Sequence, residues 1–181
     1  GGARASARAD SLAPVPEVRL TLVESWPSET TLDHPDIPDA ADVWVDLVRH
    51  ARQKLDFAEF YVSDDPRGGG RLKEVVTALL DAARRGVQIR FLVDNNFYRT
   101  YPDLPDSLGR QPNITLRRLD TKAYSTGIQH AKYFLVDSTT VYLGSQNFDW
   151  RSLTEIQELG VVLQGGEAAA AYQAVFDLDW L

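Results

Sequence analysis

QHAKYFLVDSTTVYLGSQN, residues 129–147, sets two short apolar runs beside a histidine, a lysine and an asparagine. The runs alternate as β-strands do, and the polar residues between them predict a short turn that pairs them as a hairpin. Side chains two positions apart on a strand share a face, so His130 and Lys132 are expected side by side. Ser145 and Asn147 are expected to share a face of the second strand. The segment therefore predicts one small polar surface on an otherwise apolar hairpin.

The four polar side chains of this hairpin suit a tetrahedral phosphate. Lys132 offers a point charge, and Ser145 and Asn147 offer neutral donors. His130 can act as a nucleophile or as a proton carrier. A metal site is the rival interpretation, but three histidines and no cysteine provide no metal-ligand spacing in this chain, so no metal is expected.

Outside the hairpin, the apolar pattern alternates between strands and helices. Strands are expected in VRLTLVES from residue 18, DFAEFYVS, VQIRFLVDN, ITLRRLD and ELGVVLQ. One helix is expected after an Asp39 cap, with apolar spacing that continues to Leu55, a second before Gly86, and a third over residues 166–179. This order predicts an α/β fold in which a mixed β-sheet is flanked by helices on both faces.

Two loops are expected beside these elements. DDPRGGG, residues 64–70, lacks the Gly-Lys-Ser/Thr ending of a phosphate-binding loop and is interpreted as a turn. Residues 95–113 contain three prolines and are expected to form a surface loop. Its aromatic residues Phe97, Tyr98 and Tyr101 could stack nucleic-acid bases, although anchoring of the loop is the simpler interpretation.

The composition limits the number of domains and the kind of partner. A chain of 181 residues with 44% hydrophobic residues can bury one core. Residues 1–17 have no hydrophobic period and are expected to form a flexible linker or a mature N-terminus, so the folded domain is expected over residues 18–181. A net charge of −7 argues against a protein that coats nucleic acid, so a phosphate substrate would need a local basic pocket.

The spacing His-x-Lys, four residues, Asp, six residues, Gly-Ser-x-Asn resembles the signature of the phospholipase D superfamily. GSQNFDWRSLTEIQELGVV, STGIQHAKYFLVD and VRLTLVESWP are similar to the amino-terminal half of its lysosomal branch, which is known for degrading single-stranded DNA and RNA from the 5′ end. The resemblance covers residues 18–181. It implies one half of a phospholipase D-type pseudo-twofold fold, with a single signature motif.

The resemblance also implies roles for the site residues. His130 would attack phosphorus and form a phosphohistidine, or would protonate the leaving group, while Lys132 would hold the non-bridging oxygens. Glu158 matches the family acid that hydrogen-bonds a signature histidine and fixes its tautomer. Asp137 is expected to hold the hairpin. Asn147 completes the candidate catalytic set, Ser145 supports it, and neither a cofactor nor a metal is implied.

Partners and substrate follow from the same resemblance. A complete site needs two signatures, so a companion carboxy-terminal half with its own signature is favoured, and a homodimer is the alternative. The favoured activity is a phosphodiesterase that hydrolyses single-stranded nucleic acid. A phospholipase D or phosphatidyl transferase acting on phospholipid, and a non-catalytic half of a larger assembly, are the alternatives. The resemblance alone favours a secreted or lysosome-like acidic compartment.

Overall fold

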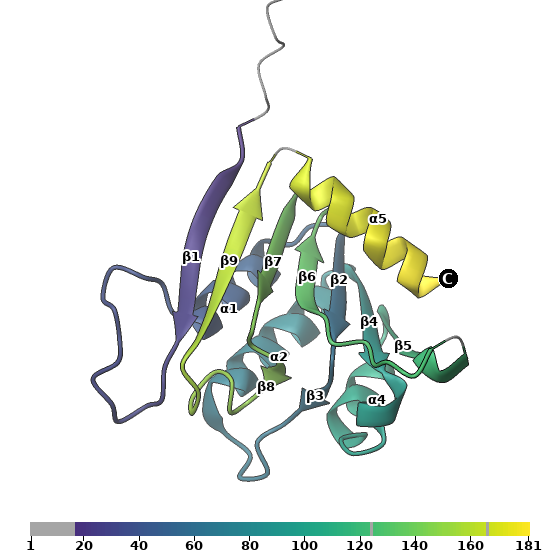
Figure 1. Ribbon diagram of the computed structural model, residues 1–181, viewed down its shortest axis with the longest axis horizontal. Helices are drawn as coiled ribbons and strands as arrows, with labels where there is room; N and C mark the ends of the chain where they lie inside the picture. The colour runs from purple at the N-terminus through teal and green to yellow at the C-terminus, as the bar shows by residue number, and fades with distance from the viewer. Residues whose placement is uncertain (1–16, 124, 166) are drawn as a thin grey trace, which may run out of the picture.

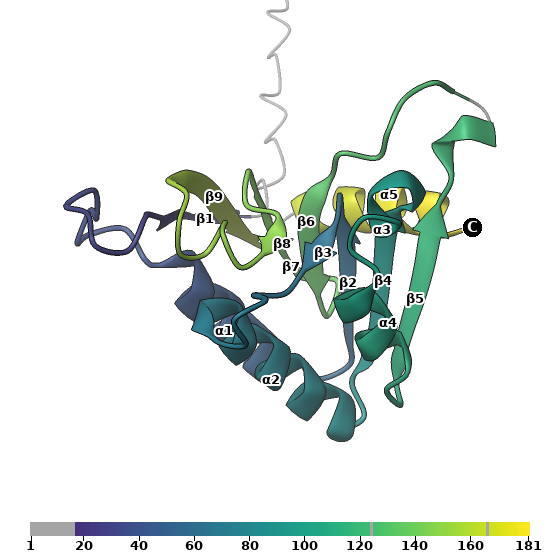
Figure 2. The same cartoon turned by 90° about the horizontal axis from the view of Figure 1, so that it is seen from below.

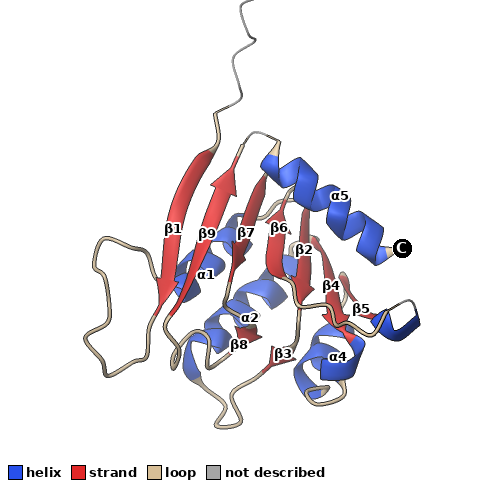
Figure 3. Cartoon of the chain, viewed as in Figure 1, coloured by secondary structure: helices blue, strands red, loops and turns tan. Residues whose placement is uncertain are grey.

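The chain folds around one mixed sheet, described here from a computed structural model that covers residues 17–123, 125–165 and 167–181. The expected linker, apart from Glu17, lies outside the described residues. The sheet has seven strands in the order β1-β9-β7-β6-β2-β4-β5, as Figures 1 and 3 show. The strands are β1 (Arg19–Ser25), β2 (Lys54–Glu59), β4 (Gln88–Asp94), β5 (Ile114–Leu119), β6 (Lys132–Val136), β7 (Thr140–Gly144) and β9 (Glu158–Gln164).

Strands β2, β4 and β5 run parallel to one another, whereas β6, β7, β9 and β1 pair antiparallel. A separate parallel pair joins β3 (Val62–Ser63) to β8 (Phe148–Asp149). The helices are α1 (Ala40–His50), α2 (Gly70–Arg84), α3 (Asn95–Tyr98), α4 (Asp103–Gly109) and α5 (Ala168–Trp180), with a 3-10 turn η1 at Thr121–Ala123. Among the helices of the described residues, none is both long and apolar enough to cross a bilayer.

Helices cover both faces of the sheet, which confirms the predicted fold class. Helices α1 and α2 lie on one face and α5 lies on the other (Figure 2). The larger core lies between the sheet and α1 and α2, where Trp44 packs edge-on against Phe134 and Tyr142. On the opposite face, Phe176 of α5 packs over Leu135 of β6. The sheet therefore stands between two apolar layers.

The first helix begins as expected and ends earlier than expected. The Asp39 carboxylate accepts hydrogen bonds from the backbone of Ala41 at 2.7 Å and of Asp42 at 3.1 Å, which caps α1. The helix stops at His50 because the backbone at its C-cap is extended. Leu55, which the helical spacing placed in this helix, is fully buried in β2 instead. Leu55 therefore belongs to β2, because its burial in the sheet outweighs the helical spacing of the apolar residues.

The predicted hairpin is present as β6 and β7, with Phe134 opposite Tyr142. Strand β7 ends at Gly144, so Ser145 and Asn147 lie in the following loop and not on the strand face expected from sequence. Gly144, the last residue of β7, still pairs with Gly160 of β9, and an added Cβ at position 144 would lie 2.9 Å from the Gly160 Cα.

The expected loop over residues 95–113 contains two short helices. Helix α3 starts where the Asp94 carboxylate accepts from the backbone of Asn96 at 2.9 Å and of Phe97 at 3.1 Å. Helix α4 buries Leu104 and Leu108. Prolines in this segment suggested an irregular chain, but a proline in the first turn of a helix removes no required hydrogen bond.

Candidate active site

Five strands have an end at one edge of the sheet, the lower edge in Figure 1, and four of them place a polar residue there. Strands β2 and β4 end there at Glu59 and Asp94, and β6 begins there at Lys132. Strand β7 ends there at Gly144, and β9 begins there at Glu158. The reversal of direction along a mixed sheet brings these ends together although they are far apart in sequence. The edge is therefore the place where the candidate site residues converge.

His130 and Lys132 are in contact at this edge. The Lys132 Nζ lies 3.2 Å from Nε2 and 3.3 Å from Nδ1 of the His130 ring, and it donates to the His130 carbonyl oxygen at 3.2 Å. His130 is exposed, and its ring packs edge-on against Phe60 at 4.5 Å. Partial desolvation and the Lys132 charge lower the pKa of His130. The imidazole therefore stays neutral, with a lone pair available, to more acidic pH than an ordinary histidine.

Lys132 lies between two acids. Glu59 is its direct neighbour across the β2–β6 pairing, and Glu158 begins β9. Desolvation lowers the pKa of Lys132, and the charges of Glu59 and Glu158 oppose that shift. The two carboxyl groups thus act on the ammonium through their charge, while its tip contacts the imidazole. This arrangement places one fixed positive charge where a phosphate oxygen could bind.

Glu59 was not among the residues expected from sequence. It is buried, and that burial raises its pKa well above the usual range, although the Lys132 charge and the Phe148 backbone N–H act in the other direction. Within the described residues its Oε2 has no hydrogen-bond partner. The sequence feature that could have indicated Glu59 is a charged residue within the apolar stretch LDFAEF. A buried acid in such a strand needs a partner, which makes it a candidate site residue.

Glu158 lies beside serines rather than beside His130. Burial raises its pKa, while hydrogen bonds with Ser152 and Ser145 act to lower it. The described part of the chain contains no hydrogen bond between Glu158 and His130, so the tautomer-fixing role implied by the family remains a proposal. Its carboxyl group instead contributes to the electrostatic environment of Lys132.

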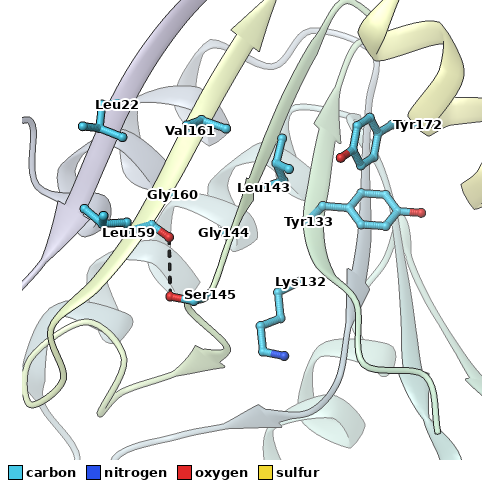
Figure 4. Close-up of a pocket in the computed structure, with 10 residues that line it drawn as sticks. All are labelled: Leu22, Lys132, Tyr133, Leu143, Gly144, Ser145, Leu159, Gly160, Val161 and Tyr172. Carbon is cyan, nitrogen blue, oxygen red and sulfur yellow. Dashed lines mark hydrogen bonds between the residues drawn. The ribbon is translucent and has the colours of Figure 1, made fainter. Parts of the chain in front are cut away.

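Ser145 and Asn147 are held by the loop that crosses to β9. The Ser145 hydroxyl donates to the Leu159 carbonyl oxygen at 3.4 Å, as Figure 4 shows, and the Asn147 backbone N–H donates to the Ser152 hydroxyl at 3.2 Å. In the described residues, the buried Asn147 Oδ1 has no partner. Ser145 and Lys132 lie at the same end of a cavity of ≈ 430 Å³ (Figure 4). Its apolar lining includes Leu22, Leu143, Leu159, Val161 and Tyr172.

Asp137 lies at the other end of β6 from Lys132. Its carboxylate accepts from three consecutive backbone N–H groups, of Arg52 at 3.0 Å, Gln53 at 2.8 Å and Lys54 at 3.0 Å. Burial alone would raise the pKa of Asp137, but these donors outweigh it and hold the pKa below its usual value. The residue thus joins the hairpin turn to the segment between α1 and β2, at a distance from the phosphate-binding end.

Two of the three expected stacking residues join a group of aromatic rings that begins at Phe60, beside His130. The Phe97 ring centroid is 3.9 Å from that of Phe60, and Tyr101 stacks on Tyr61 at 5.1 Å. Tyr98 instead donates its hydroxyl to Asp106 at 2.6 Å, and the Arg118 guanidinium lies over its ring. The structure thus separates Tyr98 from the others. Across residues 17–123, 125–165 and 167–181, no three His, Asp or Glu side chains are grouped so that they could hold a metal ion.

Comparison with known proteins gives relatives of two named activities. The chain is 34% identical to phospholipase D Y of Dictyostelium discoideum over 131 residues, which is 68% of this chain and 30% of that protein. It is 34% identical to the 5'-3' exonuclease PLD3 of Bos taurus over 172 residues, which is 88% of this chain and 34% of that protein. The chain therefore spans about a third of the length of these curated relatives.

A solved structure and a domain-family model also match this chain. The solved structure of NucT from Helicobacter pylori matches with a TM-score of 0.71 at 15% identity, over 91% of this chain and 96% of NucT. The domain family described as "Cardiolipin synthase, PLD-like domain" matches residues 45–180, most of the chain. The His-x-Lys pair, the sheet that carries it and these matches lead to one assignment: the chain belongs to the PLD-like domain family of the phospholipase D superfamily.

Proposed function

We propose that this chain is a phosphodiesterase that hydrolyses single-stranded nucleic acid through a phosphohistidine intermediate. The observation that carries the proposal is the contact of Lys132 with an exposed imidazole whose pKa is lowered. A neutral imidazole is a nucleophile, and an adjacent ammonium stabilises negative charge on a phosphoryl group. The 5'-3' exonuclease PLD3 of Bos taurus, matched over 88% of this chain, supports nucleic acid as the substrate.

The reaction has two steps in this proposal. An imidazole nitrogen of His130 attacks phosphorus, an N–P bond forms, and the bond from phosphorus to the leaving oxygen breaks. A second histidine gives its proton to that oxygen. The second histidine, now neutral, then removes a proton from water, and the water oxygen attacks phosphorus. The N–P bond breaks and releases the phosphate monoester and neutral His130. Lys132 binds the non-bridging oxygens throughout, and Asn147 is the neutral donor beside it.

Residues 1–181 carry one signature, so in this proposal the second histidine comes from a second signature outside them. In an in-line displacement the nucleophile and the proton donor stand on opposite sides of phosphorus, so a single imidazole cannot do both. Two sources are open, a second copy of this chain and a companion half with its own signature. A second copy is supported by the match to NucT, which this chain covers over 96% of its length.

An open apolar face lies beside the site and suits such a partner. Leu20, Leu22 and Leu159 project from β1 and β9 and are 62%, 41% and 54% exposed. On this same face, Figure 1 shows that α5 lies over the strands farther from β1 and leaves most of β1 and β9 uncovered. Exposed leucines next to a charged pair are typical of an interface with an apolar surround and a polar centre.

A direct test compares substrates and variants. Purified protein should release mononucleotides from a single-stranded oligonucleotide in the presence of EDTA. Denaturation at alkaline pH, where the N–P bond survives, should trap a labelled phosphohistidine that is lost on treatment with acid. His130→Ala should abolish turnover and labelling, and Lys132→Ala should lose about 10² or more in rate because it removes a charge that stabilises the transition state. His50→Ala, at an exposed helix position, is the control. Retained turnover in His130→Ala would rule out the phosphohistidine mechanism.

A phospholipase activity is the second candidate. It is favoured by the apolar cavity of ≈ 430 Å³ beside Lys132, which could receive an acyl chain, and by the match to phospholipase D Y. Release of headgroup from phosphatidylcholine vesicles, with no cleavage of oligonucleotide, would favour this activity over the first.

A further inference from the structure

We propose that four aromatic rings, Phe60, Phe97, Tyr61 and Tyr101, form a track on which the bases of a single strand stack as the strand enters the site at His130. This inference rests on the proposed nuclease function and specifies how that function selects its substrate. The four residues are called the aromatic track below.

The rings follow one another away from the imidazole. Phe60 contacts His130 edge-on at 4.5 Å, and Phe97 lies 3.9 Å from Phe60. Tyr61 lies 6.1 Å from Phe97 in a stacked orientation, and Tyr101 stacks on Tyr61 at 5.1 Å. Tyr61 also contacts Phe60 edge-on at 5.5 Å, so Phe60, Phe97 and Tyr61 form a cluster beside the nucleophile, and Tyr101 extends it outward. Its members come from the end of β2, from α3 and from the segment that follows α3, so the fold and not one local turn assembles it.

The track is partly open to solvent. Phe60 is 7% exposed and forms its base, whereas Tyr61, Phe97 and Tyr101 are half-buried and present part of each ring at the surface. Aromatic rings at a surface near a phosphate site are the usual platform for single-stranded nucleic acid, because every base has a π-face.

Polar anchors hold the outer rings in place. The Tyr61 hydroxyl lies beside the fully buried Asp149 carboxylate, and burial together with this neighbour raises the pKa of Tyr61 to about 12. The Arg151 guanidinium, which is itself paired with Asp149, lies 5.9 Å from the centroid of the Tyr101 ring. Rings held by such neighbours lose little conformational freedom when a base stacks on them, which favours binding.

These anchors favour a base over an acyl chain as the occupant. The outer end of the track opens on a cavity of ≈ 480 Å³ lined by Tyr101, Trp150 and Arg151, together with Asp64, Asp65 and Asp103. An acyl chain would have to run beside these charged groups without satisfying them. A base brings its own hydrogen-bonding edges, and its sugar and phosphate can remain in water.

The experiment removes the π-face and the base separately. Tyr61→Leu and Tyr101→Leu keep an apolar side chain but no ring, whereas Tyr61→Phe and Tyr101→Phe keep the ring and lose only the hydroxyl. Each protein is assayed with a single-stranded oligonucleotide and with an abasic strand of the same length, which has the same phosphates and no bases. Trp180→Leu, on α5 at the other face of the sheet, is the control for loss of an aromatic residue.

For the leucine variants we expect KM for the base-bearing strand to rise about 10-fold or more and KM for the abasic strand to stay within about twofold. The phenylalanine variants should show a much smaller rise on the base-bearing strand, because they keep the ring and lose only its polar anchor. Equal losses on both strands would overturn the proposal, because they would show that the rings only hold His130 in place. No change on either strand would also overturn it. Failure of the wild-type protein to cleave either strand would refute the proposed nuclease function itself.

Discussion

Desolvation lowers the pKa of His130, and Lys132 lowers it further, because its ammonium lies 3.2 Å from the imidazole and a nearby positive charge disfavours the imidazolium. Replacing it by the uncharged Lys132→Met should therefore raise the pKa of His130 toward its ordinary value. An NMR pH titration of the histidine ring resonances can measure this. The chain has three histidines, so the ring resonances of His34 and His50 serve as internal references. An unchanged His130 titration would mean that desolvation alone sets its pKa.

Glu59 makes stability depend on pH in a defined direction. Its pKa is raised in the folded state, so the protonated form is favoured there. Its contribution to stability is complete below its unfolded pKa, near 4.5, and is lost as the pH rises toward the folded pKa. Glu59→Gln removes this loss. We expect the Tm of the variant minus that of the wild type to increase steadily from pH 4.5 to pH 8, measured by thermal unfolding in matched buffers.

Parallel Tm curves for the two proteins would contradict this account of Glu59. The wild type measured at each pH is the control, because other carboxyl groups, such as Asp137, titrate equally in both proteins. Lys132 keeps its second acid, Glu158, in the variant, so the local charge is reduced and not abolished.

Individual site residues differed in how far the sequence could predict them. The contact of His130 with Lys132 was predicted from their spacing and is present, but β6 begins only at Lys132, so His130 lies in the segment before the strand and not on its face. Glu59 could not be assigned, because its neighbour Lys132 is 73 positions away and only the β2–β6 register brings them together. The same applies to Asp94, whose carboxylate accepts from the Gln129 backbone N–H at 3.0 Å and so fixes the residue before His130.

At the scale of elements, the hairpin is tied to the rest of the sheet by one side chain. Asp137→Ala removes the acceptor of three backbone N–H groups at the start of β2. We expect a loss of about 2–4 kcal/mol in the free energy of unfolding, because hydrogen bonds to a charged acceptor are stronger than neutral ones. Urea unfolding at constant m-value would measure it. Asp137→Asn keeps one acceptor oxygen and should lose about half as much; equal losses would indicate a general disturbance of the turn.

The strands and the long helices could be predicted from the periodicity of the apolar residues, whereas their ends and the short helices could not. Trp44 and Val48 of α1 are buried as the helical spacing predicts. Its end could not be located, because an apolar residue at position 55 fits a helix and a buried strand equally well. Helix α3 has four residues, too few for a periodic pattern, and depends on the Asp94 cap.

At the scale of the whole molecule, the two faces of the sheet are covered unequally. Helices α1 and α2 bury one face, while α5 leaves exposed leucines on β1 and β9 of the other. The sequence predicted helices on both faces but not this asymmetry, because the pattern of a strand does not tell which neighbour covers it. The uncovered part adjoins the edge that carries Lys132, so a partner placed there would complete both the core and the site.

If that partner is a second copy, the two chains share one site and a damaged subunit should inactivate its partner. Wild type and His130→Ala, unfolded together in equal amounts and refolded, would give about half mixed dimers and a quarter wild-type dimers. A shared site then leaves about one quarter of the activity, because a mixed dimer has one signature histidine. Independent sites would leave about one half. Activity that falls linearly with the wild-type fraction, together with a monomeric mass by light scattering, would exclude the shared site, whereas a quadratic fall identifies the second copy as the source of the second histidine.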